Sequence, residues 1–168
     1  QPYVDNKLCG QCHLPSKYDS VQHHHHPDST KPGTHCVECH MPETTYMVVD
    51  ARRDHSLRVP RPELTMHLGI PNACNLCHQD PEKGETPAWA AEWIKKWYGQ
   101  RKEPPHFAYA FDKGRKLDPS GVADLLAVAR RQDLSAIVRA SAVLLLANYG
   151  DEAARGAVFA AARDPEPL

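Results

Sequence analysis

The spacing of the cysteines constrains this chain more than any other feature. All six cysteines fall in three copies of one pattern, Cys-x-x-Cys-His, and none is left over. This pattern is typical of covalent haem attachment, in which two thiols form thioethers with the haem and the adjacent histidine ligates the iron. The sequence therefore predicts three c-type haems. The attaching residues are Cys9, Cys12, Cys36, Cys39, Cys74 and Cys77, and the proximal iron ligands are His13, His40 and His78.

Three other uses of paired cysteines predict features that this sequence lacks. Structural zinc sites pair Cys-x-x-Cys units and give no reason for a histidine after every second cysteine. A thioredoxin-like redox motif occurs once, within a βαβ pattern, and disulfides need no adjacent histidine. Haem attachment is the interpretation that uses all three residues of each motif.

The short distance between the motifs predicts how the haems are arranged. The motifs lie between residues 9 and 78, which leaves about 25 residues per haem, too few to enclose each one separately. We therefore expect the haems to pack against one another and to form the core of this segment. Because thioether formation takes place on exported apoprotein, we expect the protein in the periplasm, at the cell surface or outside the cell.

Composition divides the chain near residue 115. Twelve of the 15 prolines precede residue 106, and the later sequence is rich in Ala, Leu, Val and Arg. We expect a mostly α fold with much irregular coil: a haem-packed cytochrome c domain at 1–115 and an α-helical HEAT-like repeat at 116–168. The formal net charge of -1 does not suggest nucleic acid as a partner. There is no apolar run of about 18 residues, and so no membrane span is expected.

The distal iron ligands must come from the remaining histidines or from methionine. Adjacent or alternate members of the run His23 to His26 could reach two haems from one short segment, although a purification tag is the alternative reading. His55 is the best single candidate, because the prolines after it favour an extended path from Ser56 to Pro62. Met41, Met47 and Met66 could also ligate. The other histidines, expected to lie at the surface or against haem, are His35, His67 and His106.

Two helical regions are predicted in the second half of the chain. Thr86 and Pro87 begin a helix that Gly99 ends, and its three tryptophans lie at i, i+4 and i+8, which favours packing on the haem segment. From Pro119, two or three Ala/Leu-rich helices follow, and the segment at 133–137 recurs at 164–168. This recurrence predicts HEAT-type repetition, with a small closed helical bundle as the alternative.

The chain resembles large multihaem c-type cytochromes whose C-terminal parts carry HEAT or tetratricopeptide repeats. The resemblance covers nearly the whole chain and rests on the strings at 8–13, 18–26, 36–50, 52–62 and 69–78. It implies a His-His-x-His distal cluster at His23, His24 and His26, with His25 not a ligand, and a further distal ligand at His55. It also implies that this chain is part of a longer protein with further haem motifs.

Two histidines at each iron leave no free position for a substrate. We therefore expect an electron-transfer protein rather than an enzyme: a carrier or relay with three bis-histidine haems, within a larger assembly, and with other redox proteins or cytochromes as partners. The alternatives are a multihaem oxidoreductase acting on nitrogen or sulfur oxyanions, and a scaffold whose HEAT-type surface docks partners.

Overall fold

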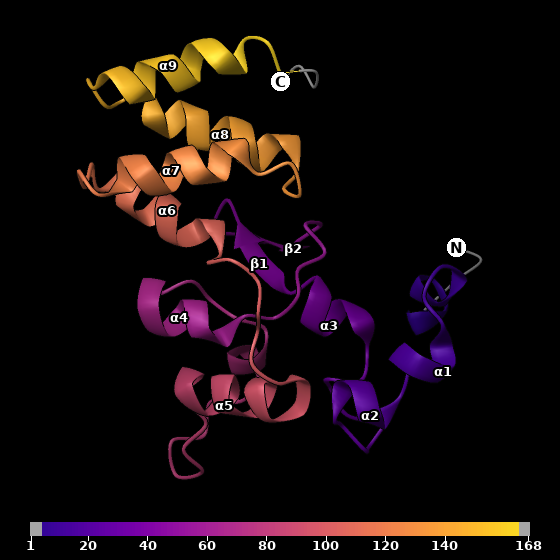
Figure 1. Ribbon diagram of the computed structural model, residues 1–168. Helices are drawn as coiled ribbons and strands as arrows, with labels where there is room; N and C mark the ends of the chain where they lie inside the picture. Colours follow the sequence, from indigo (N-terminus) through magenta and orange to yellow (C-terminus); the bar gives the residue numbers. More distant parts are fainter. Residues whose placement is uncertain (1–4, 165–168) are drawn as a thin grey trace. The chain divides into compact units, whose positions relative to one another are not determined.

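The computed structural model describes residues 5–164, which are mostly helical (Figure 1). The chain divides into two compact units, with the boundary between Gln100 and Arg101. This boundary precedes the expected one near residue 115, because helix α6 (Phe107–Arg115) packs on the helices that follow it. No helix among these residues is both long enough and apolar enough to cross a membrane.

The first unit consists of short elements joined by irregular segments, as its sequence predicts. Its strands form one antiparallel hairpin in which Glu43 pairs with Arg53. Its 3-10 helices are η1 (Asp5–Lys7), η2 (Cys9–Gln11) and η3 (Cys74–Leu76), its strands β1 (Glu43–Tyr46) and β2 (Asp50–Arg53), and its α-helices α1 (Pro15–Tyr18), α2 (Val21–His24), α3 (Cys36–His40), α4 (Pro62–Leu68) and α5 (Pro87–Tyr98).

Helix α5 confirms the boundaries read from the sequence. The hydroxyl of Thr86 accepts a hydrogen bond from the amide of Trp89, Pro87 occupies the first turn, and Gly99 follows the helix with φ 79°. The extended path expected from Ser56 to Pro62 is wrong at both ends, because His55 and Ser56 lie in a turn and Leu57 has φ 50°. Pro62 is the first residue of α4, a position where its missing amide hydrogen costs nothing.

Apolar burial is sparse in the first unit. Among its described residues, the buried apolar side chains are Pro62, Leu64 and Ala90. The main cluster of buried apolar residues belongs instead to the second unit, where Leu125, Ala142 and Leu146 are fully buried. The side chains of the first unit therefore form little hydrophobic core of their own.

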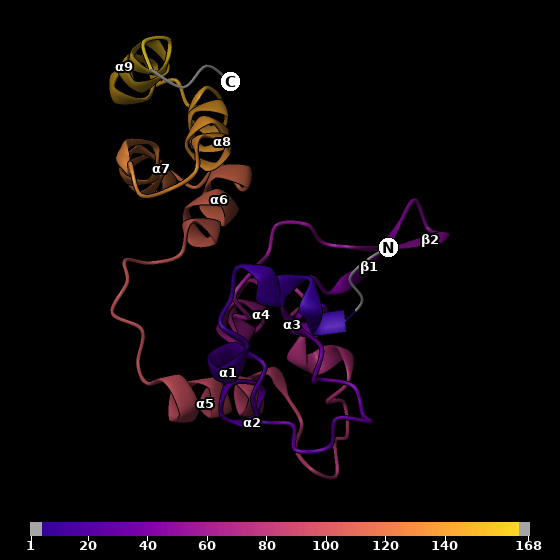
Figure 2. The same ribbon diagram turned by 90° about the vertical axis from the view of Figure 1, so that its right-hand side faces the viewer.

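The second unit is a two-layer stack of helices. After α6 come α7 (Gly121–Arg130), α8 (Ala136–Leu146) and α9 (Glu152–Ala161), which confirms the helices expected beyond Pro119. Figure 2 shows α6 and α8 in one layer and α7 and α9 in the other. Gly114 permits this packing, because a Cβ there would lie 3.0 Å from Leu125.

Helix α6 was not expected, although its sequence carries a helical signal. Its most deeply buried residues, Ala110, Phe111 and Gly114, follow Phe107 at intervals of three, four and seven, which is the spacing of an amphipathic helix. The expected recurrence at 164–168 lies outside the described residues except for Asp164, which pairs with Arg139 of α8 (3.1 Å).

Candidate haem-binding site

Each Cys-x-x-Cys-His motif forms one helical turn. The histidine amides of the first and third motifs donate to the carbonyl oxygens of Cys9 and Cys74, both at 2.9 Å. The second motif is helix α3 itself. Because residues i and i+4 of a helical turn lie on one face, each histidine is close to the first cysteine of its motif, as attachment of one haem by both groups requires.

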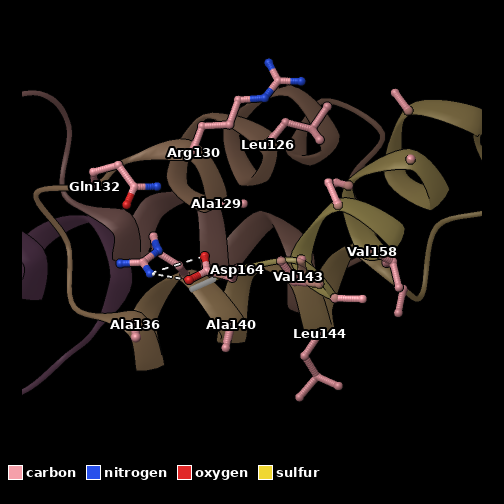
Figure 3. Close-up of a pocket in the computed structure, with 18 residues that line it drawn as sticks. Leu126, Ala129, Arg130, Gln132, Ala136, Ala140, Val143, Leu144, Val158 and Asp164 are labelled. Atoms are coloured by element: carbon pink, nitrogen blue, oxygen red, sulfur yellow. Dashed lines mark hydrogen bonds and ion pairs between the residues drawn. The ribbon is translucent and has the colours of Figure 1, made fainter. Parts of the chain in front are cut away.

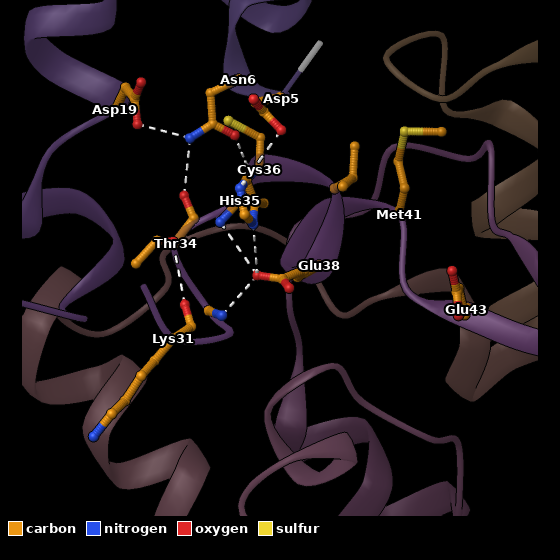
Figure 4. Close-up of polar contacts among 12 residues, drawn as sticks. Asp5, Asn6, Asp19, Lys31, Thr34, His35, Cys36, Glu38, Met41 and Glu43 are labelled. Carbon is orange, nitrogen blue, oxygen red and sulfur yellow. Dashed lines mark hydrogen bonds and ion pairs between the residues drawn. The ribbon is translucent and has the colours of Figure 1, made fainter. Parts of the chain in front are cut away.

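A polar network joins the first motif to the second. The side-chain amide of Asn6 donates to a carboxylate oxygen of Asp19 (2.7 Å) and to the carbonyl oxygen of Thr34 (2.9 Å). Its carbonyl oxygen accepts from the backbone amide of Cys36 (2.8 Å). Figure 4 shows this network beside the start of α3. The segment before the first motif therefore fixes the beginning of the second.

The cysteine thiols of successive motifs lie beside one another. Burial and, next, the neighbouring thiol of Cys9 raise the pKa of Cys36 to about 11. Burial likewise raises the pKa of Cys39 to about 11, and Cys74 is the next cause. The second motif is thus coupled electrostatically to the first through Cys36 and to the third through Cys39.

Two members of the His23–His26 run lie about 6 Å from the histidines of two different motifs. The ring centres of His23 and His40 are 6.2 Å apart, with ring planes 6° from parallel. Those of His26 and His78 are 6.0 Å apart, with planes inclined by 38°. A metal–imidazole bond is about 2 Å long, and so two imidazoles on opposite sides of one iron have ring centres about 6 Å apart. Both separations fit a bis-histidine haem.

Four histidine rings among the described residues of the first unit make a hydrogen bond to an oxygen atom through Nδ1, which leaves Nε2 for a metal. Metal-ligating histidines generally donate their other ring N–H to a carbonyl or carboxylate oxygen, which fixes the ring orientation. The observed pairs are His26 with the carbonyl oxygen of His24 (2.5 Å), His40 with that of Arg58 (2.8 Å), His55 with that of Arg53 (2.8 Å), and His78 with the carboxylate of Glu85 (3.2 Å).

Two other histidines have the opposite arrangement. Nδ1 of His24 accepts the backbone amide of His26 (3.2 Å), and Nδ1 of His106 accepts that of Ala108 (3.2 Å). A neutral imidazole that accepts at Nδ1 carries its proton on Nε2. These rings are therefore poorly prepared for ligation through Nε2.

The first motif has no opposing histidine among residues 5–164. The ring in contact with His13 is that of Tyr18, edge-on at 5.6 Å, and Tyr18 also contacts His23 at 5.3 Å. His55 is exposed just after β2. Its role as a distal ligand stays a prediction.

Helix α5 packs its aromatic side chains against the histidines rather than against apolar residues alone. The ring centres of Trp89 and His78 are 4.9 Å apart. Trp97 stacks on His25 with ring centres 3.9 Å apart and ring planes 9° from parallel. The hydroxyl of Tyr98 donates to the carbonyl oxygen of His23. The tryptophan stripe predicted from the sequence thus contacts both the His23–His26 run and the histidine of the third motif.

Gly33 makes room for His26, which the sequence did not predict. Its φ is 98°, and a Cβ there would lie 2.7 Å from Cδ2 and Nε2 of His26 and 2.9 Å from Cε1. A carboxylate oxygen of Glu38 accepts the amides of Gly33 (2.6 Å) and His35 (3.2 Å), which holds this loop. Pro32 before Gly33 was the one signal of a tight turn.

The candidate iron ligands occur in pairs rather than in larger groups. Among the described residues, no three His, Cys, Asp or Glu side chains form a metal site. A haem iron needs only two axial ligands, because the porphyrin supplies the other four. The cysteines, the anchored proximal histidines and the two facing histidines therefore fit covalent haem.

A groove of about 1030 Å³ lies in the second unit, between α7, α8 and α9 (Figure 3). Its lining is mainly Ala, Val and Leu, and the ion pair of Arg139 with Asp164 lies at its edge. It contains no cysteine or histidine. The groove is therefore separate from the candidate haem ligands.

Comparison of the chain with protein-family models, with curated proteins and with solved structures finds no significant match.

Proposed function

We propose that this chain is a c-type cytochrome segment that transfers electrons through three covalently bound haems. The observation that carries this proposal is the pair of histidine separations, 6.2 Å for His23 and His40 and 6.0 Å for His26 and His78. Each pair includes the histidine of a Cys-x-x-Cys-His motif. The separations match two imidazoles on one iron, while the cysteines beside them are spaced for thioether attachment.

Each residue has a defined role in this proposal. The six cysteines attach the porphyrins, His40 and His78 are proximal ligands, and His23 and His26 are their distal partners. When bound, each haem supplies an iron that changes between the ferric and ferrous states. The protein orients the rings by holding Nδ1 and excludes substrate by filling both axial positions.

The contiguity of the motifs supports a relay. The thiol of Cys36 interacts with that of Cys9, and the thiol of Cys39 is electrostatically coupled to that of Cys74, which favours neighbouring porphyrins at these positions. The scarcity of buried apolar side chains in the first unit supports haem as the missing core. The two-layer helical stack supports a HEAT-like repeat, and its groove is compatible with docking a partner.

The compartment and the partners belong to the same proposal. Covalent haem attachment takes place on exported protein, and so the chain works in the periplasm, at the cell surface or outside the cell. Its electron donors and acceptors are other redox proteins or further haem domains in a larger assembly.

An oxidoreductase is the second candidate, and one observation favours it. His13 faces no histidine among residues 5–164, and so the iron at the first motif is where an open axial position would occur. His55 is the ligand proposed to close it. The alternative enzyme would act on nitrogen or sulfur oxyanions at this iron.

Paramagnetic resonance of the oxidised holoprotein tests the proposal. Bis-histidine iron is low-spin, and we expect three low-spin signals in the wild-type protein and little effect of carbon monoxide on the reduced spectrum. His23→Ala and His26→Ala should each convert one of the three irons to high-spin, whereas the matched control His24→Ala should convert none. Rapid binding of carbon monoxide at one haem, with turnover of nitrite or hydroxylamine, would favour the enzyme instead.

A further inference from the structure

The two proximal histidines with distal partners differ in what their Nδ1 atoms contact. Nδ1 of His40 lies 2.8 Å from the carbonyl oxygen of Arg58, a neutral acceptor. Nδ1 of His78 lies 3.2 Å from a carboxylate oxygen of Glu85. One ring therefore donates to a neutral group and the other to an anion.

Glu85 is held in place by one contact of its side chain and one of its backbone. Its second carboxylate oxygen accepts the backbone amide of Asp80 (3.1 Å), and its carbonyl oxygen accepts the side-chain amide of Asn75 (3.2 Å). The side chain is only 15 % exposed. The nearby ammonium of Lys83 pairs with Asp80 at 2.9 Å. The carboxylate that faces His78 is thus fixed by the fold.

An anionic acceptor changes the electronic character of an imidazole ligand. A hydrogen bond to a carboxylate is roughly twice as strong as one to a neutral acceptor. It draws the Nδ1 proton away from the ring and makes Nε2 a more basic ligand. A more basic axial ligand stabilises ferric over ferrous iron, and so it lowers the reduction potential.

We propose that Glu85 sets the reduction potential of the iron bound by His78 and holds it below that of the iron bound by His40. This inference rests on the proposed function, because it requires haem at both positions. One electron shared between the two irons then leaves the His40 iron ferrous and the His78 iron ferric. Glu85 acts through His78 and is a positioning residue with an electronic effect.

The test compares Glu85→Gln with Glu82→Gln by spectroelectrochemical titration of the holoprotein. Glutamine keeps a hydrogen-bond acceptor and removes the charge. Glu82 is exposed on the same loop, and so its substitution changes the net charge equally without altering the contact with His78. We expect Glu85→Gln to shift one haem about tenfold toward the ferrous state, which is about 59 mV for one electron, and Glu82→Gln to shift none.

Two further measurements make the result decisive. The shifted haem should give the resonance signal that disappears in His26→Ala, and Glu85→Asp, which keeps the charge, should shift it less than Glu85→Gln does. Three haems with unchanged potentials in Glu85→Gln, or equal shifts in Glu82→Gln, would overturn the role of Glu85 alone. A wild-type protein without covalent haem would instead overturn the proposed function.

Discussion

Replacing Gly33 with alanine should release one distal ligand. The new Cβ would lie 2.7 Å from Cδ2 and Nε2 of His26 and 2.9 Å from Cε1. These nearly equal distances put it over the face of the ring. Carbon atoms pack at about 3.5–4.0 Å, and so the ring must move by about 1 Å. A displacement of about 1 Å is half the length of a metal–imidazole bond, which is about 2 Å. It would break the bond between His26 and the iron or greatly weaken it.

The backbone adds a cost that a control can separate from the ring contact. Gly33 has φ 98°, and a left-handed conformation costs a residue with a Cβ about 1–2 kcal/mol. Gly84 has φ 67°, but no atom lies within 4 Å of the place that a Cβ would take there. Gly84→Ala therefore carries a comparable backbone strain without displacing a histidine.

The assay is paramagnetic resonance of the oxidised proteins, with the haem content matched by absorption. We expect Gly33→Ala to convert one of three irons to high-spin, as His26→Ala does, and Gly84→Ala to keep all three low-spin. An unchanged low-spin spectrum in Gly33→Ala would refute the assignment of His26 as a ligand in this position. High-spin iron in both glycine variants would show that backbone strain alone is responsible.

Three further predictions concern packing and pH. Trp97→Ala removes the ring that stacks on His25 at 3.9 Å, and we expect a mixture of low-spin and high-spin iron on warming, measured by absorption. Leu146→Ala, at a fully buried position, should destabilise the second unit by about 2–5 kcal/mol in denaturant titrations, with unchanged haem spectra. A hydrogen bond from the amide of Ser120 lowers the pKa of Asp118, so its stabilising contribution is present above the unfolded value of about 4. This contribution to stability is lost as the pH falls through the lower folded pKa. Asp118→Asn should therefore reduce the loss of stability at low pH, measured as the fall of the thermal unfolding temperature with pH.

The local sequence predicted those parts of the fold that depend on neighbouring residues. The boundaries of α5 follow from Thr86, Pro87 and Gly99, whose capping chemistry is local. The helices after Pro119 follow from a 3.6-residue apolar pattern. Helix α6 was missed although the helical spacing of its apolar residues is visible in the sequence. These residues pack on α7 and α8, and this packing between separate segments cannot be read from the segment itself.

The candidate site shows a similar division. The cysteines and histidines proposed to hold haem lie in short motifs and could be read directly from the sequence. The pairing of His23 with His40 and of His26 with His78 could not, because it depends on a fold that joins distant segments. Glu85 was also missed, since a carboxylate seven residues after His78 has no sequence signal until the loop brings the two together.

Intact mass is the most direct test of the central claim. The protein, purified from a host that attaches haem to exported chains, is extracted with acidified acetone, which removes haem that is not covalently bound, and is then weighed by mass spectrometry. We expect the mass of the chain plus three haems, and one haem fewer when Cys74 and Cys77 are both replaced by alanine. The mass of the bare chain, with all haem in the organic phase, would contradict covalent attachment and with it the proposed electron relay.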